Sequence, residues 1–184
     1  PTVHELAAAD EQQVLRLWEG LGYYRRARGL HAAAKLVVEE YDGVFPSDVP
    51  TLQELPGIGR YTAGAIVSIA FNRPAPILEA NTIRLFSRLI ALRVDATSTA
   101  GQKVLWQTAE DLLPSKDFSR FNQALMELGS LVCTPAEPKC KTCPAGKLCH
   151  AHKQGLVSEI GRTKKKLKFT EVRELTAIHA IRPP

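Results

Sequence analysis

The sequence lacks a long apolar segment, a signal peptide, an initiating methionine and any cysteine before residue 133. No apolar run approaches the ~18 residues of a membrane helix, so we expect no membrane partner. Without a secretion signal, we expect an intracellular protein: cytoplasmic or nucleoid-associated if bacterial, nuclear or mitochondrial if eukaryotic. The chain opens at Pro1 and stops at Pro184, which suggests an excised fragment truncated at both ends.

The sequence has only a slight excess of positive over negative charge. The 184 residues include 24 Lys and Arg against 19 Asp and Glu, a net charge of +5, and 45% of them are hydrophobic. That apolar content is enough for a folded core, and the length fits one domain or one domain plus a fragment. The basic excess suits a polyanionic partner, but many proteins this basic bind no nucleic acid.

Apolar residues recur at helical spacing almost throughout, which predicts an all-α fold. The predicted helices span residues 11–18, 23–41, 51–55, 60–71, 81–92, 100–113 and 118–133. Asn81 or Thr82 is the expected N-cap of the helix at 81–92. Residues 153–170 are basic and poor in apolar side chains, which indicates a linker. Apolar residues from 172 to 181 suggest a strand, so 171–184 is expected to begin a further, truncated domain.

All four cysteines fall within 17 residues, in the spacing C-x6-C-x2-C-x5-C. Four thiolates so close in sequence can surround one metal centre, and four cysteines are the usual ligand set of a [4Fe–4S] cluster. A structural zinc site is the alternative, although such sites usually have two C-x2-C pairs 15–20 residues apart. Two disulfides are also possible on paper. The candidate ligands are Cys133, Cys140, Cys143 and Cys149.

The segment Leu55-Pro-Gly-Ile-Gly-Arg60 joins two predicted helices. Gly57 and Gly59 permit a tight turn with positive φ and let a sugar–phosphate backbone approach closely. The next helix would then present free backbone N–H groups to a phosphate. A plain helix–helix turn explains a bare P-G-x-G equally well.

Longer motifs give the chain a specific resemblance. LWEGLGYYRRAR at 17–28, YTAGAI at 61–66 and FNQALMELG at 121–129 are similar to the MutY-type adenine glycosylases, which belong to the helix-hairpin-helix DNA glycosylases. The similarity runs to about residue 152. It implies a two-lobed fold: a helical barrel lobe at 1–76 with the hairpin at 51–72, and a cluster-bearing lobe at 77–152.

The resemblance also implies a function. The expected activity is base-excision repair that removes adenine mispaired with 8-oxoguanine or guanine, with double-stranded DNA as partner, a [4Fe–4S] cofactor and a monomeric protein. Endonuclease III-type glycosylases share this layout and form the first alternative. Bifunctional members attack the sugar with a lysine directly after the hairpin, where this chain has Tyr61. A phenol cannot form a Schiff base, so hydrolysis by water is expected.

Glu79 and Asn81 occupy the place of the family's catalytic Asp-Gly-Asn. N-glycosidic cleavage builds positive charge on the sugar, which a nearby carboxylate stabilises. Glutamate adds one methylene, and a displacement of about 1 Å can cost ~100-fold in rate. Tyr61 is expected to hydrogen-bond within the same pocket.

The remaining candidates concern DNA. Gln123 matches the family residue that contacts the extruded adenine, and an amide can pair with adenine N6 and N7. Tyr23 matches the aromatic side chain that enters the base stack. Arg84 resembles an arginine that braces the cluster region. The expected DNA contacts are Gly57, Gly59, Arg60, Arg26, Lys139 and Lys141.

The resemblance places a general-acid glutamate upstream of Pro1. This chain alone is therefore expected to bind DNA weakly and to be inactive, because adenine leaves poorly unless it is protonated. The unusual Glu79 leaves a second alternative open, a non-catalytic DNA-binding module with a structural cluster.

Overall fold

The structure is a computed structural model that describes residues 2–161. Every regular element in that range is a helix, so the all-α prediction is confirmed there. The elements are α1 (Val3–Ala8), α2 (Glu11–Leu17), α3 (Tyr24–Tyr41), α4 (Val49–Glu54), α5 (Arg60–Ala65), the π-helix η1 (Ile66–Ala70), α6 (Ala80–Leu89), α7 (Thr99–Asp111), α8 (Phe118–Glu127), the π-helix η2 (Leu128–Val132), the 3₁₀-helix η3 (Cys140–Thr142) and α9 (His150–Lys153).

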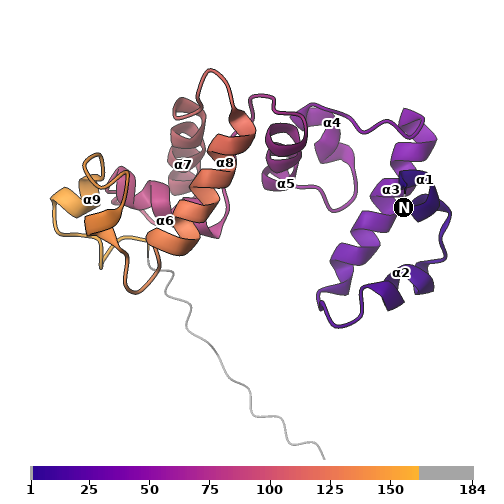
Figure 1. Ribbon diagram of the computed structural model, residues 1–184, viewed down its shortest axis with the longest axis horizontal. Helices are drawn as coiled ribbons and strands as arrows, with labels where there is room; N and C mark the ends of the chain where they lie inside the picture. Colours follow the sequence, from indigo (N-terminus) through magenta and orange to yellow (C-terminus); the bar gives the residue numbers. More distant parts are fainter. Residues whose placement is uncertain (1, 162–184) are drawn as a thin grey trace, which may run out of the picture.

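The helices form an elongated arrangement (Figure 1), with α1, α2 and α3 at one end, α4 and α5 in the middle, and α6 to α9 at the other end. One buried core joins α3, α4 and α5, and includes Val37 and Leu52. A second core joins α6, α7 and α8 around Phe86 and Leu105. The predicted lobe boundary between residues 76 and 77 falls between these cores and stays a prediction.

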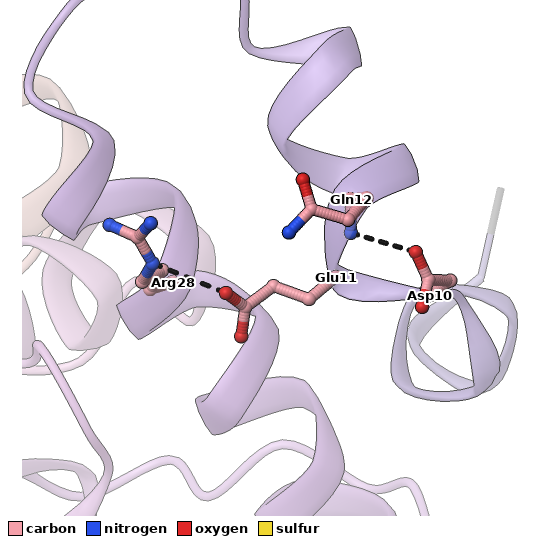
Figure 2. Close-up of polar contacts among 4 residues, drawn as sticks. All are labelled: Asp10, Glu11, Gln12 and Arg28. Atoms are coloured by element: carbon pink, nitrogen blue, oxygen red, sulfur yellow. Dashed lines mark hydrogen bonds and ion pairs between the residues drawn. The ribbon is translucent and has the colours of Figure 1, made fainter.

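Polar caps begin several of the helices. Thr2 and Glu5 form a capping box on α1, and the carboxylate of Asp10 accepts a hydrogen bond from the Gln12 N–H at 2.9 Å to open α2. Figure 2 shows this cap beside an ion pair of 3.2 Å between Glu11 and Arg28, which links α2 to α3. Both partners are about half exposed, so the ion pair adds little stability.

Two helices end in a wider π turn. The predicted helix at 60–71 consists of α5 and η1, and the one at 118–133 consists of α8 and η2. The contact between α8 and η1 connects the two halves of the molecule. The predicted helix at 81–92 ends earlier, at Leu89, and the short helices α1 and α9 were not expected.

The predicted linker at 153–170 begins within α9. Its first part packs against the second half of the molecule, where Leu156 and Ile160 contact Ala91 and Ala151. The rest of the linker, and the strand expected within 171–184, lie outside the described residues. Among the described helices, none combines the length and apolar character that crossing a bilayer requires.

Candidate functional site

The hairpin between α4 and α5 packs backbone to backbone against α3. Gly57 has φ +79°, and a Cβ there would lie 3.3 Å from the Cα of Gly29. A Cβ on Gly29 would in turn lie 3.4 Å from the Cα of Gly57. Gly59 is the N-cap of α5, and nothing lies within 4 Å of its own Cβ position. Gly57 is therefore needed for packing, whereas the space beside Gly59 is open to a ligand.

Glu79 is the N-cap of α6. Its Oε1 accepts hydrogen bonds from the backbone N–H groups of Asn81 (2.9 Å) and Thr82 (3.0 Å). Its Oε2 accepts one from the side-chain amide of Asn81 at 3.3 Å. The hydroxyl of Thr82 accepts the backbone N–H of Glu79 at 2.8 Å, which completes a capping box. Glu79 and Asn81 are thus brought together, and the carboxylate is fixed at a helix N-terminus.

The expected cap, Asn81 or Thr82, was wrong. Asp, Asn, Ser and Thr are the usual N-caps because their short side chains reach the N2 or N3 amide directly. Glu79 does so by folding its longer chain back onto the helix. The sequence signal was Thr82 three residues later, a capping box with the usual residue types exchanged.

Tyr61 lies close enough to Glu79 for the charge of the carboxylate to affect the phenol. Burial, and after it the negative charge of Glu79, raises the pKa of Tyr61, so the phenol keeps its proton. The hydroxyl donates to the sulfur of Met126 at 3.7 Å. Gly64, three residues further along α5, lets the helix lie close to the segment that leads to Glu79, because a Cβ there would collide with the carbonyl oxygen of Pro76.

Arg84 connects the Glu79 region to the first cysteine. Its guanidinium donates to Asn81 Oδ1 at 2.8 Å, to the carbonyl of Gly129 and to the carbonyl of Cys133 at 2.7 Å. Burial is the main cause of the lowered pKa of Arg84, and the negative charges of Cys133 and Glu79 oppose it. The arginine is only 7% exposed. One side chain therefore contacts a residue beside the carboxylate and a residue of the cysteine loop.

All four cysteines are free thiols and line one cavity, whose walls also include Arg88. Burial raises the pKa of the Cys140 thiol, and the nearby Cys133, Cys149 and Cys143 raise it further. In the part of the chain that the structure describes, no three His, Cys, Asp or Glu side chains are gathered tightly enough for a single metal ion.

Arg88 was missed by the sequence analysis. It is 1% exposed, and its guanidinium lies 3.3 Å from the sulfur of Cys133. The available signal was its spacing of four residues from Arg84, which places two arginines on one face of the helix beside Leu85 and Phe86.

Tyr23 projects from the turn before α3. Its side chain is 84% exposed, and its φ of +47° is unusual for a bulky residue. The indole N–H of Trp18 donates to the carbonyl of Gly22 at 2.8 Å and so holds the preceding turn. Arg26 lies 5.7 Å from the ring centroid of Trp18.

Other candidates are spread more widely. Arg60 pairs with Glu110 at 2.9 Å and lies 3.8 Å from the ring centroid of Trp106, so α7 already holds it. Lys139 and Lys141 are exposed beside the cysteines. Gln123 donates to the hydroxyl of Ser119 at 3.0 Å and lines a hollow whose residues include neither Glu79 nor Tyr61.

Known proteins resemble this chain in sequence and in structure. The sequence pattern of "HhH-GPD superfamily base excision DNA repair protein" matches residues 1–110. An adenine DNA glycosylase of Rattus norvegicus is 47% identical over 155 residues, which cover 84% of this chain and 30% of that protein. The corresponding values for the Homo sapiens enzyme are 46%, 84% and 28%. The chain thus spans about a third of the length of these relatives.

Solved structures share the fold. A thermostable thymine-DNA glycosylase superposes with a TM-score of 0.74 at 27% identity, covering 83% of this chain and 70% of that one. Endonuclease III in a non-covalent DNA complex gives a TM-score of 0.68 at 27% identity, covering 84% and 71%.

Proposed function

Since this chain belongs to the HhH-GPD superfamily of base excision DNA repair proteins, we propose that it is the core of an adenine DNA glycosylase that hydrolyses the N-glycosidic bond without a covalent lysine intermediate. The observation that carries the proposal is that the negative charge of Glu79 acts on Tyr61, whose pKa it helps to raise. The position after the hairpin therefore holds a phenol rather than an amine, within reach of the charge of a carboxylate that is fixed at the N-terminus of α6. The rat and human adenine DNA glycosylases support adenine as the base removed.

In the proposed mechanism, Glu79 stabilises the positive charge that develops on the sugar as the base departs. Asn81 holds Oε2 of the carboxylate, and Thr82 fixes the backbone from which the side chain extends. Tyr61 keeps its hydroxyl proton within reach of the charge of the same carboxylate, and it would release its contact with Met126 to donate that proton in the pocket. Water then attacks the sugar. The acid that protonates adenine is proposed to lie outside this chain.

The proposed substrate is adenine opposite 8-oxoguanine or guanine in double-stranded DNA, bound by a monomer inside the cell. Tyr23 is suited to enter the base stack because it is exposed and already held by a rigid turn. Gln123 is proposed to contact the extruded adenine. Gly57, Gly59, Arg60, Arg26, Lys139 and Lys141 are proposed to contact the DNA backbone; of these, Arg60 must exchange its contact with Glu110 to do so.

A [4Fe–4S] cluster is the proposed cofactor, held by Cys133, Cys140, Cys143 and Cys149. The four thiols fit it in two respects: they line one cavity, and three of them help burial to raise the pKa of the fourth, Cys140. A zinc ion would need all four sulfurs at about 2.3 Å from one point. A cluster takes one thiolate at each iron and suits more widely spaced sulfurs. When bound, it would supply a rigid cross-link for the loop and a redox centre.

One observation favours a second candidate, a DNA-binding module without catalysis. Both oxygens of Glu79 already accept hydrogen bonds within the chain, so the residue has a structural role that needs no substrate. An endonuclease III-type reaction finds no such support, because position 61 is not a lysine.

Single-turnover excision by the native protein tests the proposal. Duplexes with adenine opposite 8-oxoguanine, adenine opposite guanine, and an oxidised pyrimidine serve as substrates. We expect adenine release from the first two, and no efficient DNA adduct with borohydride, because Tyr61 cannot form a Schiff base. Strong trapping, or release of the pyrimidine alone, would move the chain to the bifunctional class. Salt-sensitive DNA binding without release of any base would support the non-catalytic candidate.

A further inference from the structure

The side chain of Arg88 is buried and makes several contacts with the cysteine loop. Its Nε donates to the carbonyl of Ile160 at 3.0 Å, and its Nη2 to that of Pro135 at 3.1 Å. Its Nη1 lies 2.8 Å from the carbonyl of Thr134 and 3.3 Å from the sulfur of Cys133. A single buried side chain thus ties α6 to the start of the cysteine loop and to the segment that follows α9.

The backbone of Arg88 completes the arrangement. Its carbonyl oxygen lies 3.3 Å from the sulfur of Cys149, which donates to it as a thiol and would lose this hydrogen bond on binding iron as a thiolate. Arg88 therefore contacts both the first and the last of the four cysteines, and its side chain lines the cavity they share. Residues that contact metal ligands in this way orient those ligands and tune the metal.

A buried guanidinium is costly unless its charge is compensated. Within residues 2–161, the ion pairs that involve an arginine use Arg28 and Arg60, and none uses Arg88. Its acceptors are carbonyl groups and one sulfur. A [4Fe–4S] core with four thiolates carries net negative charge, since the thiolates outweigh the iron–sulfur core. Such a cluster would supply the counter-charge that Arg88 otherwise lacks.

We propose that Arg88 is a positioning residue for the cluster held by the four cysteines. Its charge and its N–H···S hydrogen bond to Cys133 raise the reduction potential of the cluster. The hydrogen bonds from its guanidinium to the carbonyls of Thr134 and Pro135 hold the loop in place around the cluster. This inference rests on the cluster included in the proposed function. Hydrogen bonds to ligating sulfurs and local charge are established determinants of such potentials. Arg84 differs, because it reaches the carbonyl of Cys133 rather than the sulfur.

Three variants of the native protein distinguish the effect of the positive charge of Arg88 from the effect of its hydrogen-bond geometry. Arg88→Gln removes the charge, and Arg88→Lys keeps the charge but not the forked set of donors. Arg93→Gln is the matched control, because Arg93 pairs with Gln154 on the exposed surface of the same half of the molecule. Iron content, absorbance near ~400 nm, the rate of bleaching by a chelator and the midpoint potential by film voltammetry are measured for each.

At a fixed potential, we expect the ratio of reduced to oxidised cluster to fall at least ~10-fold in Arg88→Gln, a shift of about 59 mV for one electron. Arg88→Lys should shift the potential less and yet lose its cluster to the chelator faster than wild type. Arg93→Gln should match wild type in both measurements.

The outcomes are distinguishable. Wild-type protein without iron overturns both this inference and the cluster of the proposed function. A wild-type cluster whose potential and bleaching rate match those of both Arg88 variants overturns this inference alone. If neither Arg88 variant folds, wild-type protein labelled with ¹⁵N-arginine decides: we expect guanidinium nitrogen coupling in the pulsed EPR spectrum of the paramagnetic cluster, and its absence refutes the proposal.

Discussion

Replacing Glu79 should separate its role as a helix cap from its proposed role in catalysis. Glu79→Gln keeps the length of the side chain and one acceptor oxygen for the Asn81 and Thr82 amides. It removes the negative charge from the start of α6, an interaction worth about 0.3–1 kcal/mol. Glu79→Ala removes the cap itself, which typically costs about 0.5–2 kcal/mol. The free energy of unfolding should therefore fall in the order wild type, Gln, Ala.

Catalysis should not follow that order. If Glu79 stabilises the charged sugar, both variants lose the charge, and both should slow single-turnover excision by at least ~100-fold, about 2.7 kcal/mol of barrier. Ser98→Ala is the matched control, because Ser98 caps α7 through the Gly101 amide. That variant should lose similar stability and keep its excision rate.

The stability measurement is urea unfolding. The rate is measured with the native protein, which would include the general acid proposed to lie outside this chain, in excess over a duplex containing adenine opposite 8-oxoguanine. An excision rate that falls in proportion to stability, small for Gln and larger for Ala, would refute the catalytic role. Glu79 would then be a cap alone.

Three further predictions address the rest of the molecule. Gly64→Ala should lower the free energy of unfolding by about 1–3 kcal/mol and slow excision, because the new Cβ pushes on Pro76 near Glu79; urea unfolding and the excision assay check this. Hydrogen bonds from the Thr51 N–H and then the Thr51 hydroxyl lower the pKa of Asp48 from 3.8, so its stabilisation is complete above that value and is lost as pH falls below it. In thermal melts from pH 7 to 2, the melting temperature of Asp48→Asn should therefore fall less with decreasing pH than that of wild type. Tyr23→Gly should leave stability unchanged or raise it by up to about 1 kcal/mol by relieving φ +47°, yet weaken duplex binding in a titration by about 1–3 kcal/mol; an unchanged affinity would contradict a stacking role.

Much of the helical fold was predictable because it depends on local patterns. The apolar spacing of 23–41 and the tight turn at Gly57 are visible in the sequence, and α3 and the hairpin follow them closely. The spacing of the four cysteines likewise predicts a shared site, and they line one cavity.

Other features depend on contacts between distant segments. Arg88 reads as an ordinary helical arginine until the loop at 133–135 and Ile160 close over it. Arg60 looks like a free phosphate ligand until α7 brings Glu110 and Trp106 to it. The cap formed by Glu79 is local, but glutamate is rarely chosen for that position, so residue preference pointed to its neighbours instead.

The close approach of Gly29 in α3 and Gly57 in the hairpin has a consequence for how this protein would contact DNA. The backbones of α3 and the hairpin lie so close at Gly29 and Gly57 that a Cβ at either position would crowd the other chain segment. Tyr23 sits at the start of the same helix, and Gly29 lies about 7.5 Å further along its axis than Tyr24. If Tyr23 enters the base stack and the hairpin binds a phosphate, as proposed, α3 fixes the distance between these two contacts. A fixed distance of this kind would favour duplexes in which both contacts can be made at once, so the scaffold itself would contribute to the choice of DNA conformation.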